Sequence, residues 1–166
     1  MPRMWWVVGV VAAVVLVASY VTWTATRVDR LHARAVSATK ALDAHLVRRA
    51  AAAAVLAEEL TSADLYAAAR DALDAAPDER EAAENDLTRQ LRALNRPSGD
   101  AGLDAVVAAS RRVALARQVH TDLVRDALAM RRRPLVRLLR LTRRHSVPAY
   151  FDVDDTTLEA RPLVGR

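Results

Sequence analysis

The sequence predicts an all-α protein in which a single N-terminal transmembrane helix continues into an antiparallel bundle of three to four long helices. Between Arg3 and Arg27 no residue is charged, although 27% of the chain consists of Asp, Glu, Lys and Arg. After this stretch, apolar residues recur at steps of three and four, the spacing of one buried helical face. No segment alternates with a period of two, so we expect no sheet.

The charge-free stretch is long enough to cross a bilayer. A helix needs about 20 apolar residues to span a hydrocarbon core of about 30 Å. Within lipid, the backbone amides must be satisfied inside the helix itself. Aromatic residues flank the stretch at both ends, where amphipathic rings favour the head-group layer. The expected membrane-interface residues are Trp5, Trp6, Tyr20 and Trp23.

A cleaved secretory signal is the alternative interpretation of this stretch. Its basic region would hold only Arg3, and the apolar run exceeds the usual length of about 7–15 residues. The nearest cleavage pattern, at residues 18–20, ends in Tyr20, where a small side chain is preferred. We therefore expect a retained anchor at residues 1–26 and localisation in the cell membrane as a single-pass protein. Basic residues are more numerous after the span than before it, which places the following domain on the cytoplasmic side.

We expect residues 27–151 to form the bundle, and most of these residues to be helical. Neither Gly nor Pro occurs from Val10 to Ala76, so one rod is expected from the membrane to about Leu60, with Arg27 on its charged face. Thr61 and Ser62 can cap a second helix, which Pro77 interrupts. Further helices are expected at 79–94, with Ala83 on its apolar stripe, and at 103–130, with Leu123 on its apolar stripe. A linker at 95–100 separates them. Beyond Pro134 we expect a short helix at 135–144, a docking segment at 146–151 and a flexible tail at 152–166.

Charge is distributed unevenly along this bundle. Residues 61–104 contain ten acidic and five basic residues, whereas residues 105–150 contain eleven Arg and two Asp. Such blocks can bind outside partners. They can also neutralise one another where the two segments pack as antiparallel helices, which is the explanation that we prefer.

No group of residues predicts catalysis, a metal or a cofactor. None of the four histidines has another four residues away, which is the usual spacing of a two-His site on one helix. Carboxylates gather at residues 78–86, but we expect them on an exposed, solvated face, and Glu84 is among them. The chain has no cysteine and no Gly-rich phosphate loop. We therefore expect a protein that is not an enzyme.

The segment 131–144 is the most distinctive feature after the anchor. As a helix it would carry arginines on one side and leucines on the other, and such a helix can lie on an anionic leaflet. Alternatively, it caps the bundle with its arginines facing solvent or acidic side chains. Nucleic acid is a weaker interpretation, because no aromatic residues are interleaved with the basic ones. The possible anionic-lipid contacts are Arg133, Arg137, Arg140 and Arg144.

Three segments resemble the LemA family of membrane proteins. Residues 42–49, LDAHLVRR, resemble that family's I-D-x-x-L-x-R-R segment, and residues 83–91, AENDLTRQL, resemble its A-E-N-E-L stretch. Residues 113–126 resemble its I-A-x-A-R-x-x-Y-N-D-x-V-R segment. The family's L-I-P-N-L-V is AAAVLA at 52–57, and its Tyr-Asn pair is His120-Thr121, so the chain resembles a divergent member. The resemblance implies a membrane-anchored antiparallel helical bundle, and the family has no agreed catalytic activity.

These observations together predict a scaffold or adaptor for another membrane or envelope protein, or for a second copy of the chain, with coiled-coil-like packing. The alternative is a peripheral lipid-sensing element that uses residues 131–144. The polar matches to the family provide either partner contacts or contacts between helices. They are Arg48, Arg49, Asn85, Arg117 and Asp122.

Overall fold

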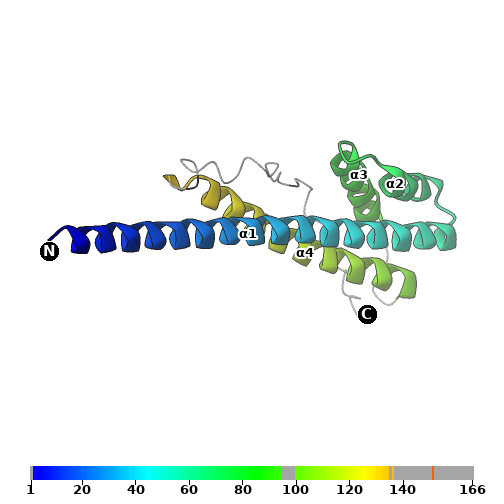
Figure 1. The fold of residues 1–166 in the computed structure, drawn as a ribbon. Helices are drawn as coiled ribbons and strands as arrows, with labels where there is room; N and C mark the ends of the chain where they lie inside the picture. The colour runs from blue at the N-terminus through cyan, green and yellow to red at the C-terminus, as the bar shows by residue number, and fades with distance from the viewer. Residues whose placement is uncertain (1, 95–99, 135, 137–150, 152–166) are drawn as a thin grey trace. The chain divides into compact units, whose positions relative to one another are not determined.

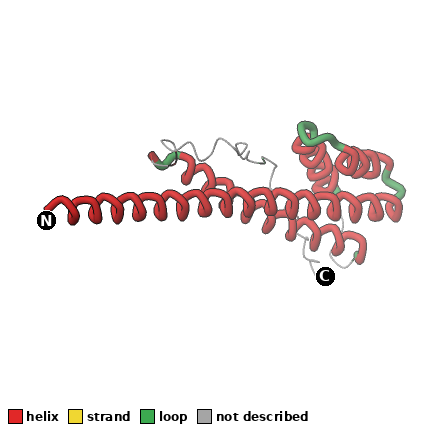
Figure 2. Tube along the Cα trace, in the orientation of Figure 1, coloured by secondary structure: helices red, strands yellow, loops and turns green. Residues whose placement is uncertain are grey.

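The computed structural model describes residues 2–94, 100–134, 136 and 151, and these form four helices (Figure 1). The helices are α1 (Pro2–Leu60), α2 (Ala63–Asp74), α3 (Arg80–Ala93) and α4 (Ala101–Arg131). No strand occurs in these ranges (Figure 2), which confirms the predicted all-helical class. Two compact units can be distinguished, one of residues 1–36 and 123–148 and the other of residues 37–122 and 149–166. We call them the N-terminal unit and the bundle unit.

Helix α1 ends at Leu60, as the sequence predicts, in a Schellman motif. The Ser62 N–H donates to the Ala57 carbonyl at 2.9 Å, and the Thr61 N–H donates to the Glu58 carbonyl at 3.1 Å. These two bonds satisfy carbonyls that have no partner within the helix. The motif places Thr61 in the left-handed region, with φ of 53°. A β-branched residue is strained in that conformation.

Replacing Thr61 with glycine is therefore expected to stabilise the bundle unit by about 1 kcal/mol, because glycine adopts a positive φ without a Cβ clash. Thermal unfolding of the full chain in detergent, followed by circular dichroism, would measure the effect. Thr61→Ala should fall between the wild type and Thr61→Gly. A loss of stability in Thr61→Gly would contradict the assignment of strain to this residue.

The start and end of α2 also follow local sequence signals. The Ser62 hydroxyl accepts a hydrogen bond from the Leu65 N–H at 3.4 Å, and Asp64 lies in the first helical turn. The helix ends at Asp74, before the turn that contains Pro77. Arg80 then donates to the Ala75 carbonyl at 3.0 Å, just beyond the end of α2. Of the two residues predicted to cap α2, Ser62 is the N-cap, and the predicted interruption at Pro77 is confirmed.

All four helices contribute to the core of the bundle unit. Helix α1 contributes mainly alanines, whose small side chains allow close packing, and Leu56 lies among them. Gly102 lies close to this face, since a Cβ at that position would lie 3.0 Å from Leu56 Cδ1. The buried members of the cluster are Ala50, Ala53, Leu56, Ala57, Leu65, Ala68, Ala69, Ala72, Leu87, Leu91, Leu103, Val106 and Val107.

Further along the bundle unit, Leu42 and Leu46 of α1 pack with Val113 of α4. Residues 56 and 57 of α1 share a cluster with residues 103–107 of α4. Residue numbers rise along one helix as they fall along the other, so α1 and α4 are antiparallel in this unit. The order agrees with the predicted antiparallel arrangement.

In the N-terminal unit, the end of α4 packs on α1 through a small apolar cluster. Val28 of α1, Met130 of α4 and Val136 are buried together, and Leu31 packs against them. Before this cluster, the described residues of α1 from Met4 to Tyr20 are all exposed. This part of α1 is long and apolar enough to cross a membrane, by length and composition.

Helix boundaries differ from the predicted ones by two residues or fewer. Helix α4 includes Ala101 and Arg131, and its buried face includes Val124, which the predicted stripe omitted in favour of Leu123. The predicted linker at 95–100, helix at 135–144, docking segment at 146–151 and tail at 152–166 lie wholly or mainly outside the described residues. The predicted domain boundaries at residues 26 and 151 stay predictions.

Candidate functional site

The apolar part of α1 has aromatic side chains at both ends. Trp5 and Trp6 are 80% and 76% exposed, and Tyr20 and Trp23 are 50% and 57% exposed. At 1.5 Å per residue, Trp5 and Trp23 are separated by about 27 Å along the helix axis, close to the thickness of a hydrocarbon core. The four predicted interface residues therefore stand at a separation that suits the two faces of one bilayer.

Polar groups near the second end of this segment are satisfied within the helix. The Thr22 hydroxyl donates to the Ala18 carbonyl at 2.9 Å, and the Thr24 hydroxyl donates to the Tyr20 carbonyl at 2.8 Å. The Thr26 hydroxyl bonds to the carbonyls of Thr22 and Trp23. Hydroxyls bonded in this way do not need water, so they are compatible with a lipid environment.

A pocket of about 160 Å³ lies in the N-terminal unit, between this end of the apolar segment and the end of α4. The Arg27 guanidinium lies over the Trp23 ring, 5.5 Å from its centroid. The centroids of the Tyr20 and Trp23 rings are 6.2 Å apart. Arg133 is exposed at the pocket. The pocket is lined by Tyr20, Trp23, Thr24, Arg27, Met130, Arg133, Pro134 and Val136.

The bundle unit contains a buried ion pair between α1 and α3. Arg49 and Glu84 are both fully buried, with Arg49 Nη1 3.4 Å from Glu84 Oε2. Arg49 also donates to the Thr88 hydroxyl, which in turn donates to the Glu84 carbonyl at 2.8 Å. Among the described residues, Arg49 Nε and Glu84 Oε1 have no hydrogen-bond partner. The pair is thus buried and incompletely hydrogen-bonded, a costly arrangement for two charges.

Burial has the largest effect on the pKa values of both Arg49 and Glu84. Removal from water raises the pKa of Glu84 to about 7, although the positive charges of Arg49 and Arg80 act in the opposite direction. Burial likewise lowers the pKa of Arg49, and Glu84 partly counteracts it. The pKa of Glu84 therefore lies near neutral pH, well above the ordinary glutamate value of 4.5.

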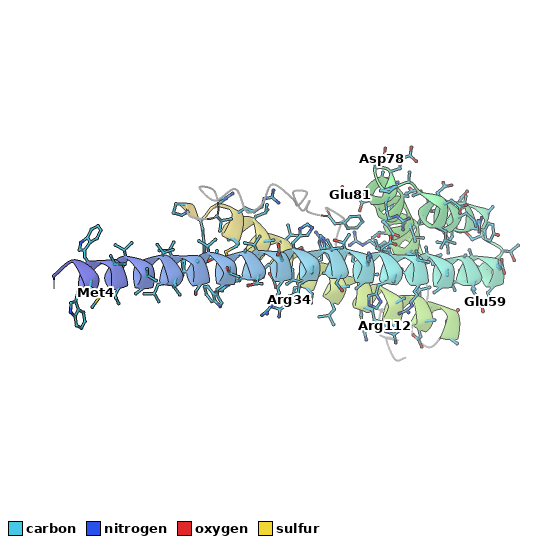
Figure 3. All side chains as sticks on the ribbon, viewed as in Figure 1. Met4, Arg34, Glu59, Asp78, Glu81 and Arg112 are labelled. Carbon is cyan, nitrogen blue, oxygen red and sulfur yellow. The ribbon has the colours of Figure 1, made fainter. Side chains whose placement is uncertain are left out.

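The predicted exposure of Glu84 is wrong. Its neighbours Asp78 and Glu79 are exposed, and Glu81 and Asp86 are half-buried. Figure 3 shows Asp78 and Glu81 near the start of α3. Glu84, however, lies on the face of α3 that carries Leu87 and Leu91, so it enters the core. Its position in an acidic run concealed its position on the apolar face.

A second ion pair accompanies the buried one. Arg80 at the start of α3 lies 2.9 Å from Asp43 of α1, and Asp43 is half exposed. Both pairs join α3 to α1. The predicted neutralisation between the segments 61–104 and 105–150 stays a prediction.

Other polar residues that match the LemA segments are dispersed over the bundle unit. Arg48 and Asp122 are exposed, whereas Asn85 and Arg117 are half-buried. Asn85, Arg117 and Asp122 each have at least one polar or electrostatic interaction. Only Arg49 of the five is fully buried. Of the possible lipid contacts, Arg133 is described, and Arg137, Arg140 and Arg144 lie outside the described residues.

Sequence reasoning missed Glu84 and Thr88 as partners of Arg49, although the spacing held a signal. Glu84, Leu87, Thr88 and Leu91 are separated by steps of three, one and three, so they share one helical face. Arg49 stands three residues after Leu46 and four before Ala53, both of which are buried. A basic residue on one apolar stripe and an acidic residue on another predict a buried pair when the two helices meet.

Helix α4 carries two further buried polar side chains, His120 and Ser110. His120 Nδ1 and Ser110 Oγ have no hydrogen-bond partner among the described residues. Burial lowers the pKa of His120, which favours the neutral imidazole. Within the described ranges, no three His, Asp or Glu side chains gather closely enough to hold a metal ion.

No family model, curated protein or solved structure matches the chain.

Proposed function

We propose that the chain is a single-pass membrane protein whose helical bundle acts as a scaffold or adaptor, and that it is not an enzyme. Its partner is another membrane or envelope protein, or a second copy of the chain. The carrying observation is that one uninterrupted helix, α1, contains an exposed apolar segment and then contributes to the core of the bundle unit. The aromatic residues at each end of the segment support insertion in a bilayer.

Energetics also support insertion. None of the residues in the most apolar window of α1 is buried by other parts of the protein. Leaving this surface in water costs about 25 cal/mol of free energy for each Å² of apolar area that is not buried. Exposed apolar patches of this extent in soluble monomers are rare and indicate a membrane or protein contact.

The bundle unit itself exposes apolar side chains that can meet a partner. Val47 and Val55 lie eight residues apart on α1 and are exposed, with fractions of 38% and 56%. On α4, Leu115 and Val119 are four residues apart and are 64% and 48% exposed. Leu115 and Val119 are neighbours on the helix surface, and Val47 and Val55 have the spacing of one broad helical face. These faces support an interaction role better than catalysis, since they carry no reactive group.

Resemblance to the LemA family supports the same proposal, and we place the chain there as a divergent member. We propose a cytoplasmic bundle, because basic residues are more numerous on that flank of the apolar segment. The alternative, a lipid-sensing helix at 131–144, concerns residues that lie mostly outside the described ranges and stays a prediction.

Membrane insertion can be tested by fractionating cells that express the full chain. The wild type should remain in the membrane pellet after an alkaline carbonate wash. Leu16→Arg combined with Ala12→Arg should reduce insertion, because each arginine at the centre of a span costs about 2.5–3.5 kcal/mol. Val47→Arg combined with Val55→Arg adds the same charge at exposed positions of the bundle unit, so it is the matched control and should stay in the pellet. Release of the wild type by carbonate would contradict the anchor.

Partner contact can be tested separately with a photo-crosslinking residue at Leu115 or Val119 in intact cells. A discrete adduct is expected, with the mass of either a dimer or a complex with one other protein. The control position is Arg70, which is exposed and bonded to Asp74 within α2. Identical patterns at Leu115 and Arg70, or no adduct at all, would contradict the adaptor proposal.

A further inference from the structure

The pocket beside Trp23 lies at the level where α1 would leave the hydrocarbon core. If Trp5 and Trp23 mark the two faces of that core, Arg27 lies one helical turn, about 6 Å, beyond it. A bilayer of about 40–45 Å with a core of about 30 Å has a head-group layer of about 5–8 Å on each side. Arg27 therefore stands at the depth of the lipid phosphates.

The pocket combines positive charge with apolar walls. Arg27 and Arg133 supply two guanidinium groups, and none of the described residues that line the pocket is acidic. Arginine binds phosphate through paired N–H donors, which makes it well suited to such a group. Met130, Pro134 and Val136 form an apolar side, and the Tyr20 and Trp23 rings form an aromatic one. The contact between Arg27 and Trp23 holds one guanidinium at the aromatic wall.

The size of the pocket restricts the ligand further. Its volume of about 160 Å³ equals that of about five water molecules in the liquid. This is enough for a phosphodiester and a small polar group, and too little for acyl chains. The chains would instead lie along the exposed apolar face of α1, which begins directly beside the pocket.

We propose that this pocket binds the head group of an anionic phospholipid, with Arg27 and Arg133 on the phosphate. The lipid adds a specific contact at the point where the α4 end packs on the anchor through Val28, Met130 and Val136. Because Met130 and Val136 belong to both the cluster and the pocket, a bound lipid stabilises the packing of the α4 end on α1. The inference rests on the proposed membrane insertion of α1.

The experiment uses the full chain with Trp5→Phe and Trp6→Phe, which leaves Trp23 as the only tryptophan. The protein is reconstituted into phosphatidylcholine vesicles that contain either brominated phosphatidylglycerol or brominated phosphatidylcholine at equal mole fraction, with bromine near the head group. Quenching of Trp23 fluorescence then reports which lipid occupies the pocket. Phosphatidylglycerol is expected to be enriched about fivefold for each arginine that contacts it.

Two variants with the same net charge distinguish lipid binding in the pocket from nonspecific electrostatic attraction between the protein and anionic lipid. Arg27→Gln with Arg133→Gln should abolish the preference for phosphatidylglycerol. Arg30→Gln with Arg34→Gln removes the same charge from exposed positions of α1 outside the pocket and should preserve it. An equal loss in both variants would show diffuse attraction and overturn the site.

Further measurements show whether the bound phosphate belongs to a lipid or is free in solution. They also show whether a negative result concerns the pocket or the membrane insertion of α1. Inorganic phosphate should leave the preference unchanged relative to sodium chloride of equal ionic strength, and competition by phosphate would overturn a lipid ligand. Equal quenching by the two brominated lipids would overturn the inference and leave the anchor intact. Absence of quenching by either lipid would instead overturn the membrane insertion on which the inference rests.

Discussion

Replacement of Arg49 with methionine is expected to lower the free energy of unfolding of the bundle unit by about 3–5 kcal/mol at pH 8. Methionine fills a similar volume, so the loss does not come from a cavity. It comes from Glu84, which remains fully buried without its counter-charge, so that it must either stay ionised in the core or take up a proton at pH 8. Thr88 would also lose the donor that now bonds to its hydroxyl.

A double-mutant cycle with Glu84→Gln measures the coupling between these two residues. Removing both charges should recover most of the lost stability, because no buried charge remains. Arg48→Met is the matched control, since Arg48 is exposed and adjacent in sequence, and it should change stability by less than about 0.5 kcal/mol. Unfolding of the full chain in detergent with urea provides the measurement. Equal effects of Arg48→Met and Arg49→Met would contradict a buried pair.

This buried pair marks the limit of prediction from sequence. Chain positions with strong local signals were predicted correctly, such as the end of α1 at Leu60 and the N-cap at Ser62. These features depend on the conformation and hydrogen bonds of a few neighbouring residues. The burial of Glu84 depends instead on Arg49, which is 35 residues away and on another helix. A charged residue within an apolar stripe gives no local indication of its partner.

Alanine is a second reason why buried positions are hard to predict, because it occurs on both the buried and the exposed faces of helices. The predicted stripe of α3 ran through Ala83, which is half-buried, and thereby displaced Glu84, which is fully buried. Similarly, Val124 is completely buried where the predicted stripe used Leu123. When adjacent residues on a helix are both apolar or small, two neighbouring stripes contain similar numbers of apolar residues, and the sequence does not distinguish between them. Only packing against a second helix determines which residue is enclosed.

The pocket beside Trp23 was not predicted, although three of the residues that line it were singled out. Aromatic enrichment at the end of the apolar segment identified Tyr20 and Trp23, and the basic run identified Arg133. Their proximity depends on the return of α4 to α1 at Met130, which no local pattern encodes. Arg27 was assigned only to the exposed charged face of the rod. Its contact with Trp23, four residues earlier, follows from helical spacing.

Raising the pH from 4.5 to 8 is expected to destabilise the bundle unit through Glu84. In the unfolded chain this carboxyl ionises with the ordinary glutamate pKa of 4.5, whereas in the folded chain its pKa is about 7. Between these values the folded state holds a proton that the unfolded state has released. Stability from this group is therefore fully present below pH 4.5, falls as pH rises towards 7 and is lost above it. The difference between the two pKa values, about 2.5, corresponds to about 3 kcal/mol.

Comparison of the wild type with Glu84→Gln isolates this effect, because the other carboxylates are common to both proteins. The stability of wild type minus that of Glu84→Gln should decrease from pH 4.5 to 8 and then become constant. Thermal unfolding at several pH values would follow it. A difference that is constant over this range would show that Glu84 has the same pKa in the folded and unfolded chains, and would contradict the prediction.

His120 should act in the opposite direction, which makes it a second check on the role of burial. Because burial lowers its pKa below 6.5, the unfolded chain binds a proton that the folded chain rejects. Its contribution is therefore present above pH 6.5 and is lost as pH falls. The stability of wild type minus that of His120→Gln should rise with pH where the Glu84 difference falls. Two buried groups of opposite charge type would then give opposite slopes, as expected if removal from water, and not a shared change in the bundle, shifts both pKa values.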